Sequence, residues 1–221
     1  MKLDRGSARL IGLTGGIASG KSTVSAMLAE KSIPVIDTDK ITRSLSCKGK
    51  PIWQEIKREF GEGYFTADGE LDRRALGELV FTNPDARSRL NRISHPLIAK
   101  EVQRQIDSIL RTGYNGGIII DAPVLIEGGW HEMMDEVWLV TASRETRTRR
   151  LMERDGLSLV QAQQRIDSQM PQEEKLKFAH RVIENDRDHA FLEKQIDMLV
   201  QDIKGWRSGD GQAETGIIQQ H

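Results

Sequence analysis

The fold of this chain is constrained most by residues 15–22, which read GGIASGKS. They fit the pattern G-x-x-x-x-G-K-[ST] of a phosphate-binding loop, or P-loop, in which glycines let backbone N–H groups turn toward a phosphate. Residues 9–14 before the loop are predicted to form a mostly apolar strand, and residues 22–31 after it a helix. The positive end of that helix then faces the same anion. The alternative is a glycine-rich turn that happens to contain lysine and serine, but a strand, this loop and a helix, in that order, favour a phosphate-binding α/β domain.

The composition excludes several other classes of protein. The 221 residues include 32 basic and 33 acidic side chains, a net charge of −1 with His neutral, so no general affinity for nucleic acid is implied. No stretch approaches the roughly 20 apolar residues of a membrane span, and the first ten residues lack the apolar run of a secretory signal. Cys47 is the single cysteine, which rules out an internal disulfide and fits a reducing compartment. We therefore expect a cytoplasmic protein that binds neither nucleic acid nor a membrane, and the sequence leaves its oligomeric state open.

Apolar runs alternate with helical patterns along much of the chain. After the first strand, short runs at 33–36, 118–120, 136–140 and 181–184 are predicted as further strands. Strands that alternate with helices in this way indicate a P-loop type of doubly wound, parallel sheet of about five strands.

Acidic residues follow two of these predicted strands. Asp37 and Asp39 come directly after the second strand, and Asp121 ends the third. Because ligands of open parallel sheets bind beyond the carboxyl ends of the strands, we expect these carboxylates near the phosphate-binding loop. Asp37 taken alone could equally be a helix N-cap, but the pair beside this loop favours a functional role. For Asp121 we expect an outer-sphere contact to Mg²⁺ or a substrate contact, with a plain strand-end cap as the alternative.

The remaining segments divide the chain into a core and two additions. Residues 41–93 are predicted to be helical without a strand, which is too long for an ordinary connection and indicates a substrate-binding insertion. Ser94, His95 and Pro96 are predicted to end that helical stretch, and a new amphipathic helix of about four turns follows them. The predicted organisation of residues 1–207 is a single domain with its core at 8–40, 94–142 and 181–205, the insertion at 41–93, a helical lid at 143–180, and a disordered tail at 208–221.

The predicted lid begins with a helix that is dense in arginine. Arg147, Arg150 and Arg154 are spaced i, i+3, i+7 and share one face, whereas Arg149 points about 100° away from Arg150. Gly156 follows the helix, and a proline at 171 breaks the next one, so the segment can move as a unit. We expect Arg150 and Arg154 to close over bound ATP and Arg149 to lie on a solvated face.

Seven separate stretches of the chain form an ordered set of motifs. They are LTGGIASGKST at 13–23, VIDTD at 35–39 with Arg43, LDRRAL at 71–76, HPLI at 95–98, DAPVLIE at 121–127, RLMERD at 150–155 and VIEN at 182–185. Together they resemble the dephospho-coenzyme A kinase family, over roughly residues 10–202. The family often has alanine where this chain has Thr38, and it usually has P-L-L-[FV]-E where residues 123–127 read PVLIE; neither change removes a charged group.

The resemblance implies an enzyme that uses ATP and Mg²⁺ to phosphorylate the ribose 3′-hydroxyl of dephospho-CoA, the last step of coenzyme A synthesis. It implies that Asp39 is the general base, that Lys21 and the loop amides hold the ATP phosphates, and that Arg150 lies over the transferring phosphoryl group. Ser22 would be the Mg²⁺ ligand, and the helical insertion would hold the CoA moiety. The expected nucleotide-binding residues are Gly16, Ile17, Ala18, Ser19, Gly20, Lys21, Ser22, Thr23, Arg150 and Asn185, and the expected substrate-binding residues are Asp37, Arg43, Arg73, His95 and Asp121.

Two alternatives stay open on the residues alone. A kinase for a nucleoside monophosphate would share the loop, the arginines and the insertion, but its acceptor phosphate is already ionised and needs no base such as the aspartate pair. A GTPase switch would need an N-K-x-D motif, and the nearest match, NDRD at 185–188, lacks the lysine. Without the resemblance, the residues indicate only Mg²⁺-ATP-dependent phosphoryl transfer to a hydroxyl.

Overall fold

The computed structural model describes residues 3–205 and divides them into two compact units. Unit 1 contains residues 3–36 and 109–205, and unit 2 contains residues 37–108. Each unit is described by itself. The predicted tail at 208–221 lies outside the described residues.

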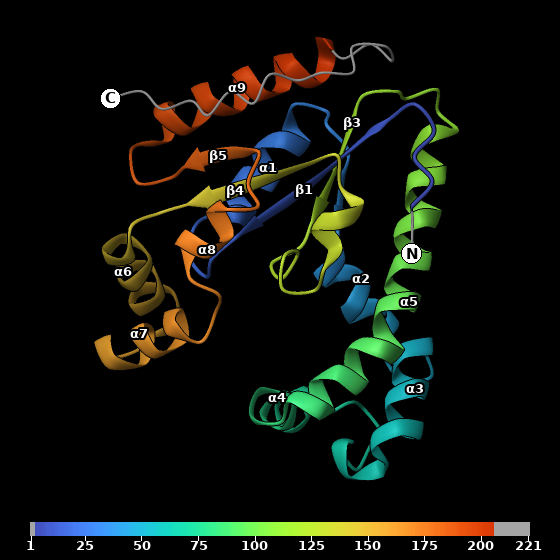
Figure 1. Ribbon diagram of the computed structural model, residues 1–221. Coiled ribbons are helices and arrows are strands. Elements are labelled where there is room, and N and C mark those ends of the chain that lie inside the picture. Colours follow the sequence, from blue (N-terminus) through green and yellow to red (C-terminus); the bar gives the residue numbers. More distant parts are fainter. Residues whose placement is uncertain (1–2, 206–221) are drawn as a thin grey trace. The chain divides into compact units, whose positions relative to one another are not determined.

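A five-stranded sheet forms the centre of unit 1 (Figure 1). Its strands are β1 (Arg9–Gly15), β2 (Val35–Asp37), β3 (Gly117–Asp121), β4 (Glu136–Thr141) and β5 (Arg181–Glu184), in the order β2-β3-β1-β4-β5. β1 runs parallel to both β3 and β4, and β4 runs parallel to β5. At the β2 side, the N–H of residue 119 donates to the carbonyl of residue 34 at 2.9 Å. The predicted sheet of about five parallel strands is confirmed, and its central strand carries the phosphate-binding loop at its carboxyl end.

Two helices cover one face of this sheet. α1 (Lys21–Glu30) follows the loop and contacts α9 (His189–Gly205), the last helix of the described chain. Alternate side chains of the strands point into the same apolar cluster because successive strand residues face opposite sides. The buried members of this cluster include Ile11, Leu13, Val24, Leu28, Ile119, Trp138, Val140, Ile183, Leu192 and Ile196.

Three further helices of unit 1 lie between β4 and β5 in sequence. They are α6 (Arg144–Asp155), α7 (Leu159–Asp167) and α8 (Gln172–Leu176), and a 3-10 turn, η2 (Trp130–Met133), precedes β4. A capping box begins α7, with Ser158 and residue 161 exchanging side-chain and backbone hydrogen bonds. α6 and α7 share a small apolar cluster with the phosphate-binding loop. Its buried members are Leu151, Ala162 and Ile166, and Ile17, Ala18 and Leu157 pack against them.

Unit 2 is helical. It contains α2 (Thr38–Leu45), α3 (Pro51–Phe60), the short η1 (Glu62–Tyr64), α4 (Arg73–Thr82), and α5 (Pro84–Leu110) up to residue 108. The carboxylate of residue 72 caps α4, because it accepts from the N–H groups of residues 74 and 75. The predicted stretch of helices without a sheet strand falls inside this unit.

One predicted boundary is wrong. The sequence predicts a break at Ser94, His95 and Pro96, but α5 continues through all three as one helix of 27 residues. Pro96 cannot donate to the preceding turn, a loss that costs about 3 kcal/mol in a helix interior. Side chains on both sides of the proline are buried, among them Ala86 and Ile98, so tertiary packing outweighs the local preference.

The beginning of α2 also differs from the prediction. The helix begins at Thr38 rather than at residue 41, because the Asp37 carboxylate accepts from the N–H of Lys40 at 2.9 Å and caps it. In residues 3–205, no helix is both long and apolar enough to cross a membrane.

Candidate active site

The phosphate-binding loop leaves several backbone N–H groups available for an anion. Ala18 and Gly20 adopt left-handed conformations, with φ of 60° and 92°, and the Ser19 N–H donates to the carbonyl of residue 16 at 3.0 Å. In residues 3–205, the N–H groups of residues 18, 20, 21 and 22 find no acceptor. Residues 21 and 22 begin α1, so the positive end of the helix dipole adds to this set of donors. This arrangement is the one that holds phosphate oxygens in P-loop proteins.

Asn185 supports the loop from the end of β5. Its Nδ2 donates to the carbonyl of Ser19 at 2.8 Å, and its own N–H donates to the carbonyl of Thr141 at 2.9 Å. A Cβ atom at Gly20 would lie only 1.9 Å from Nδ2 of Asn185, and the φ of 92° also favours glycine there. Asn185 was predicted among the nucleotide-binding residues, and it lies against the loop.

Lys21 and Asp121 form an ion pair between α1 and the end of β3. The Lys21 ammonium donates to Oδ1 of Asp121, while Oδ2 accepts from the Ser25 hydroxyl at 2.5 Å. Both charged side chains are largely buried, with 16% and 6% of their surface exposed. Asp121 therefore pairs with the loop lysine, which a carboxylate that only caps the end of a strand would not do. Ser25 was not predicted, although its place one helical turn after Lys21 could have indicated it.

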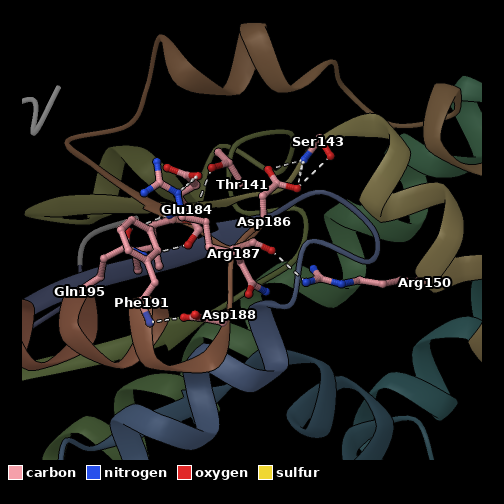
Figure 2. A network of polar contacts seen from close by, with 11 residues as sticks. Thr141, Ser143, Arg150, Glu184, Asp186, Arg187, Asp188, Phe191 and Gln195 are labelled. Carbon is pink, nitrogen blue, oxygen red and sulfur yellow. Dashed lines mark hydrogen bonds and ion pairs between the residues drawn. The ribbon is translucent and has the colours of Figure 1, made fainter. Parts of the chain in front are cut away.

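Arg150 reaches from α6 to the outer side of the loop. Its Nη1 donates to the carbonyl oxygens of Ala18 and Ser19, both at 3.3 Å, and its Nη2 donates to the carbonyl of Asn185 at 2.9 Å. Figure 2 shows the guanidinium extending from α6 toward the segment that follows β5. Arg150 therefore ties the arginine helix to the loop and to Asn185.

A carboxylate beside Arg150 fixes the start of the same helix (Figure 2). Asp186 accepts from the N–H and the hydroxyl of Ser143, the N-cap of α6, at 2.7–2.9 Å. Burial acts to raise the pKa of Asp186, but the hydrogen bonds from Ser143 and Thr146 outweigh it and lower the pKa below its usual range. A charged Asp186 thus holds the N-terminus of α6 in place, which orients Arg150.

Two residues that were not predicted for the site contact the loop directly. The N–H of Ile17 donates to Oε1 of Gln169 at 2.7 Å, and the Ile17 carbonyl accepts from Nε of Arg147 at 3.0 Å. The helical spacing in the sequence places Arg147 on the face of Arg150, but only the packing reveals that it is buried. Gln169 carries no signal in the sequence, since it lies in a polar connection.

The other predicted residues belong to unit 2. Asp37 caps α2, and Asp39 is exposed in the first turn of that helix. Nη2 of Arg73 donates to the backbone carbonyl of Arg43 at 3.3 Å, so these two predicted residues are brought together. His95 is half-buried inside α5, and burial lowers its pKa, so its imidazole is neutral at pH 7.

The comparisons with known proteins decide the family. A sequence model of dephospho-CoA kinase matches residues 9–190. A dephospho-CoA kinase of Symbiobacterium thermophilum is 47% identical over 189 residues, covering 84% of this chain and 79% of the relative. The chain belongs to the dephospho-CoA kinase family.

Solved structures that superpose on this chain support its place in the dephospho-CoA kinase family. A dephospho-CoA kinase from Campylobacter jejuni superposes with a TM-score of 0.64 at 28% identity, covering 90% of this chain and 98% of the other. The protein TT1252 from Thermus thermophilus superposes with a TM-score of 0.77 at 34% identity, covering 90% and 99%. The predicted family, the P-loop fold and a kinase that uses ATP in the last step of coenzyme A synthesis are thereby confirmed.

Proposed function

We propose that this chain transfers the γ-phosphoryl group of ATP to the ribose 3′-hydroxyl of dephospho-CoA in the cytoplasm, and that the predicted residues perform the steps. The observation that carries the proposal is the loop at 15–22, with its available N–H groups beside a lysine, in a chain of this family. Phosphoryl transfer needs little covalent chemistry from a protein; positioning and charge stabilisation supply most of the catalysis.

The phosphates of ATP fit the loop as it stands. The N–H groups at residues 18, 20, 21 and 22 would hold the inner phosphates, and the Lys21 ammonium would reach the β- and γ-phosphates. Lys21 is paired with Asp121, so bound ATP would share that charge with the carboxylate. The lysine and the N–H groups would then stabilise the charge that develops on the transferred group.

The residues around Ser22 suit Mg²⁺. This ion keeps several waters and takes one or two protein ligands together with substrate phosphates. In residues 3–205, no group of three or more His, Cys, Asp or Glu side chains could hold a metal by itself, which fits such a site rather than a protein cage. The exposed Ser22 hydroxyl at the start of α1 would be the direct ligand, and Asp121 would act through a water. When bound, Mg²⁺ neutralises charge on the β- and γ-phosphates.

The two aspartates after β2 would have different roles. Asp37 accepts a hydrogen bond as the cap of α2, and Asp39 lies exposed two residues later, in the first turn of that helix. This supports Asp39 as the base that takes the proton of the acceptor hydroxyl, with Asp37 holding the helix that carries it. Arg43 and Arg73, which are joined through a backbone hydrogen bond, would bind the phosphates of dephospho-CoA. The neutral His95 would contribute a hydrogen bond and no charge.

The two segments added to the core would each bind one substrate. The helical insertion at 41–93 would hold dephospho-CoA, and the segment at 143–180 would close over ATP. Its helices α6 and α7 already pack against Ile17 and Ala18, and Arg150 adds positive charge at the loop. Arg154 pairs with the neighbouring carboxylate of Asp155, so its part in closure depends on leaving that partner.

An acceptor screen tests the proposal. ADP release from ATP is measured with dephospho-CoA, adenosine, nucleoside monophosphates and pantetheine derivatives, each with and without Mg²⁺. We expect release in proportion to dephospho-CoA and dependent on Mg²⁺. Faster ADP release with a nucleoside monophosphate than with dephospho-CoA would contradict the proposed acceptor. Slow ATP hydrolysis at a rate that no acceptor changes would indicate a regulatory nucleotide switch instead of a kinase.

A further inference from the structure

Arg147 is a buried arginine with almost no partners. Only 6% of its surface is exposed, and burial lowers its pKa, with the nearby charge of Arg144 acting in the same direction. Within residues 3–205, its Nε donates to the carbonyl of Ile17, but neither Nη1 nor Nη2 has an acceptor. Glu173 and Asp167 act on its charge from a distance, and no carboxylate of the described chain lies within 4.0 Å.

Burying a guanidinium without a carboxylate partner destabilises the folded protein. A charged side chain taken out of water is normally paired and hydrogen-bonded, because a charge without partners in the interior destabilises the folded state. Three other arginines of α6 have partners: Arg144 pairs with Asp167, Arg154 pairs with Asp155, and Arg150 donates to backbone carbonyls. Arg149 is exposed to water. Arg147 therefore lacks the carboxylate partner that Arg144 and Arg154 have.

The position of its guanidinium indicates which anion. A Cβ atom at Gly16 would lie 2.7 Å from Nη2 and 2.9 Å from Cζ of Arg147, so the plane lies directly on the glycine. Gly16 and Ile17 form the first half of the phosphate-binding loop, whereas the available N–H groups at Gly20 and after it lie at the start of α1. Two unpartnered N–H-bearing nitrogens thus lie beside a loop that is built to receive phosphates.

We propose that Arg147 binds the terminal phosphate of ATP through Nη1 and Nη2. This proposal rests on ATP binding to the loop, which belongs to the proposed function. If the N–H groups at the start of α1 hold the inner phosphates, a cation over the first half of the loop is left for the γ-phosphate. The ligand supplies the missing anion, and the guanidinium supplies charge to the group that is transferred.

Binding measurements without an acceptor test this role. The Kd of ATP and the Kd of ADP are measured by titration calorimetry for the wild type, Arg147→Gln and Arg147→Lys, with Arg149→Gln as control. Arg149 lies exposed on the same helix and has no assigned role in the site. A lost charge-assisted hydrogen bond costs about 1.5–3 kcal/mol, so we expect Arg147→Gln to weaken ATP by about tenfold or more. We expect ADP to change by less than about threefold, Arg147→Lys to be intermediate, and Arg149→Gln to match the wild type.

The outcomes separate this role from a merely structural one. Both Arg147 variants lose the hydrogen bond from Nε to Ile17. If that bond is all that matters, the two variants weaken ATP and ADP alike, and this result would overturn the proposal. Thermal unfolding of each variant shows whether it is folded. The assay needs no dephospho-CoA: failure of the wild type to phosphorylate dephospho-CoA would refute the proposed function while the ratio of ATP to ADP affinity still decides the role of Arg147.

Discussion

Lys21 and Asp121 meet as a largely buried ion pair in which one carboxylate oxygen faces the loop lysine and the other accepts from Ser25 at 2.5 Å. The lysine of the phosphate-binding loop is thus oriented before nucleotide arrives, which reduces the ordering needed when ATP binds. The same contact links β3 to α1 at the carboxyl edge of the sheet.

Replacing this lysine tests the loop. We expect Lys21→Ala to weaken ATP binding and to lower kcat below about a tenth of the wild-type value, because the developing charge on the phosphates loses its nearest cation. Lys31→Ala is the matched control, since Lys31 directly follows the same helix and pairs with the exposed Asp197, away from the loop. Steady-state kinetics with ATP as the varied substrate measure both; a Lys21→Ala enzyme that keeps more than about a tenth of kcat would rule out the assigned role.

The two aspartates of unit 2 give a second test. Asp39→Asn should leave the Kd of ATP unchanged and lower kcat by about 10²-fold, since an amide cannot take the hydroxyl proton. The low end of the usual range is expected because the loose transition state needs proton removal only late. Asp37→Asn should cost much less, because asparagine caps a helix about as well as aspartate. If Asp37→Asn is the more damaging variant, the two roles are reversed.

The arginines of α6 give a third test. Arg150→Ala removes the hydrogen bonds to the carbonyls of Ala18, Ser19 and Asn185 and a positive charge at the loop. We expect it to lower kcat by a larger factor than it raises the KM for ATP, and Arg149→Ala to be nearly silent. Equal, small effects of both variants on kcat and KM would mean that these arginines form only a solvated surface.

A buried ion pair outside the loop gives a fourth, asymmetric prediction. Lys175 of α8 is 1% exposed and donates to Glu127, whose side chain is 27% exposed. Glu127→Gln leaves the buried ammonium without its anion and should lower the free energy of unfolding by about 3–5 kcal/mol. Lys175→Met should cost clearly less, because water can reach the remaining carboxylate and methionine fills the space. Urea unfolding of both variants measures which one loses more free energy of unfolding. A larger loss in Lys175→Met than in Glu127→Gln would contradict the view that Glu127 stabilises the fold by neutralising the buried charge of Lys175.

The features that the sequence predicts correctly depend on local patterns. The loop motif requires its glycines, and the strand ending in Asp121 is apolar at every residue before the aspartate. The boundary at Pro96 was predicted from the same kind of local rule and is wrong, because the packing of both halves of α5 is not visible in the local sequence.

Side chains that contact residues far away in the sequence are the hardest to predict. Arg147 and Gln169 contact Ile17 from 130 and 152 residues away, and Lys175 reaches Glu127 across 48 residues. Their roles depend on which side of a helix is covered and by what, and this follows only from tertiary structure. The same limit applies to Asp37: taken alone it fits a helix cap and a site residue equally, and the pair with Asp39 favours a functional role, but only the structure shows that it caps α2.

The most direct test follows the phosphoryl group itself. ATP labelled in its γ-phosphate is incubated with the wild-type protein, Mg²⁺ and dephospho-CoA, and the product is analysed by chromatography with mass spectrometry and ³¹P NMR. We predict that the label appears as a monoester on the ribose 3′-oxygen of coenzyme A, in amounts equal to the ADP formed, and that Lys21→Ala gives almost none. Label found in inorganic phosphate, or on another hydroxyl of the acceptor, would contradict the proposed reaction.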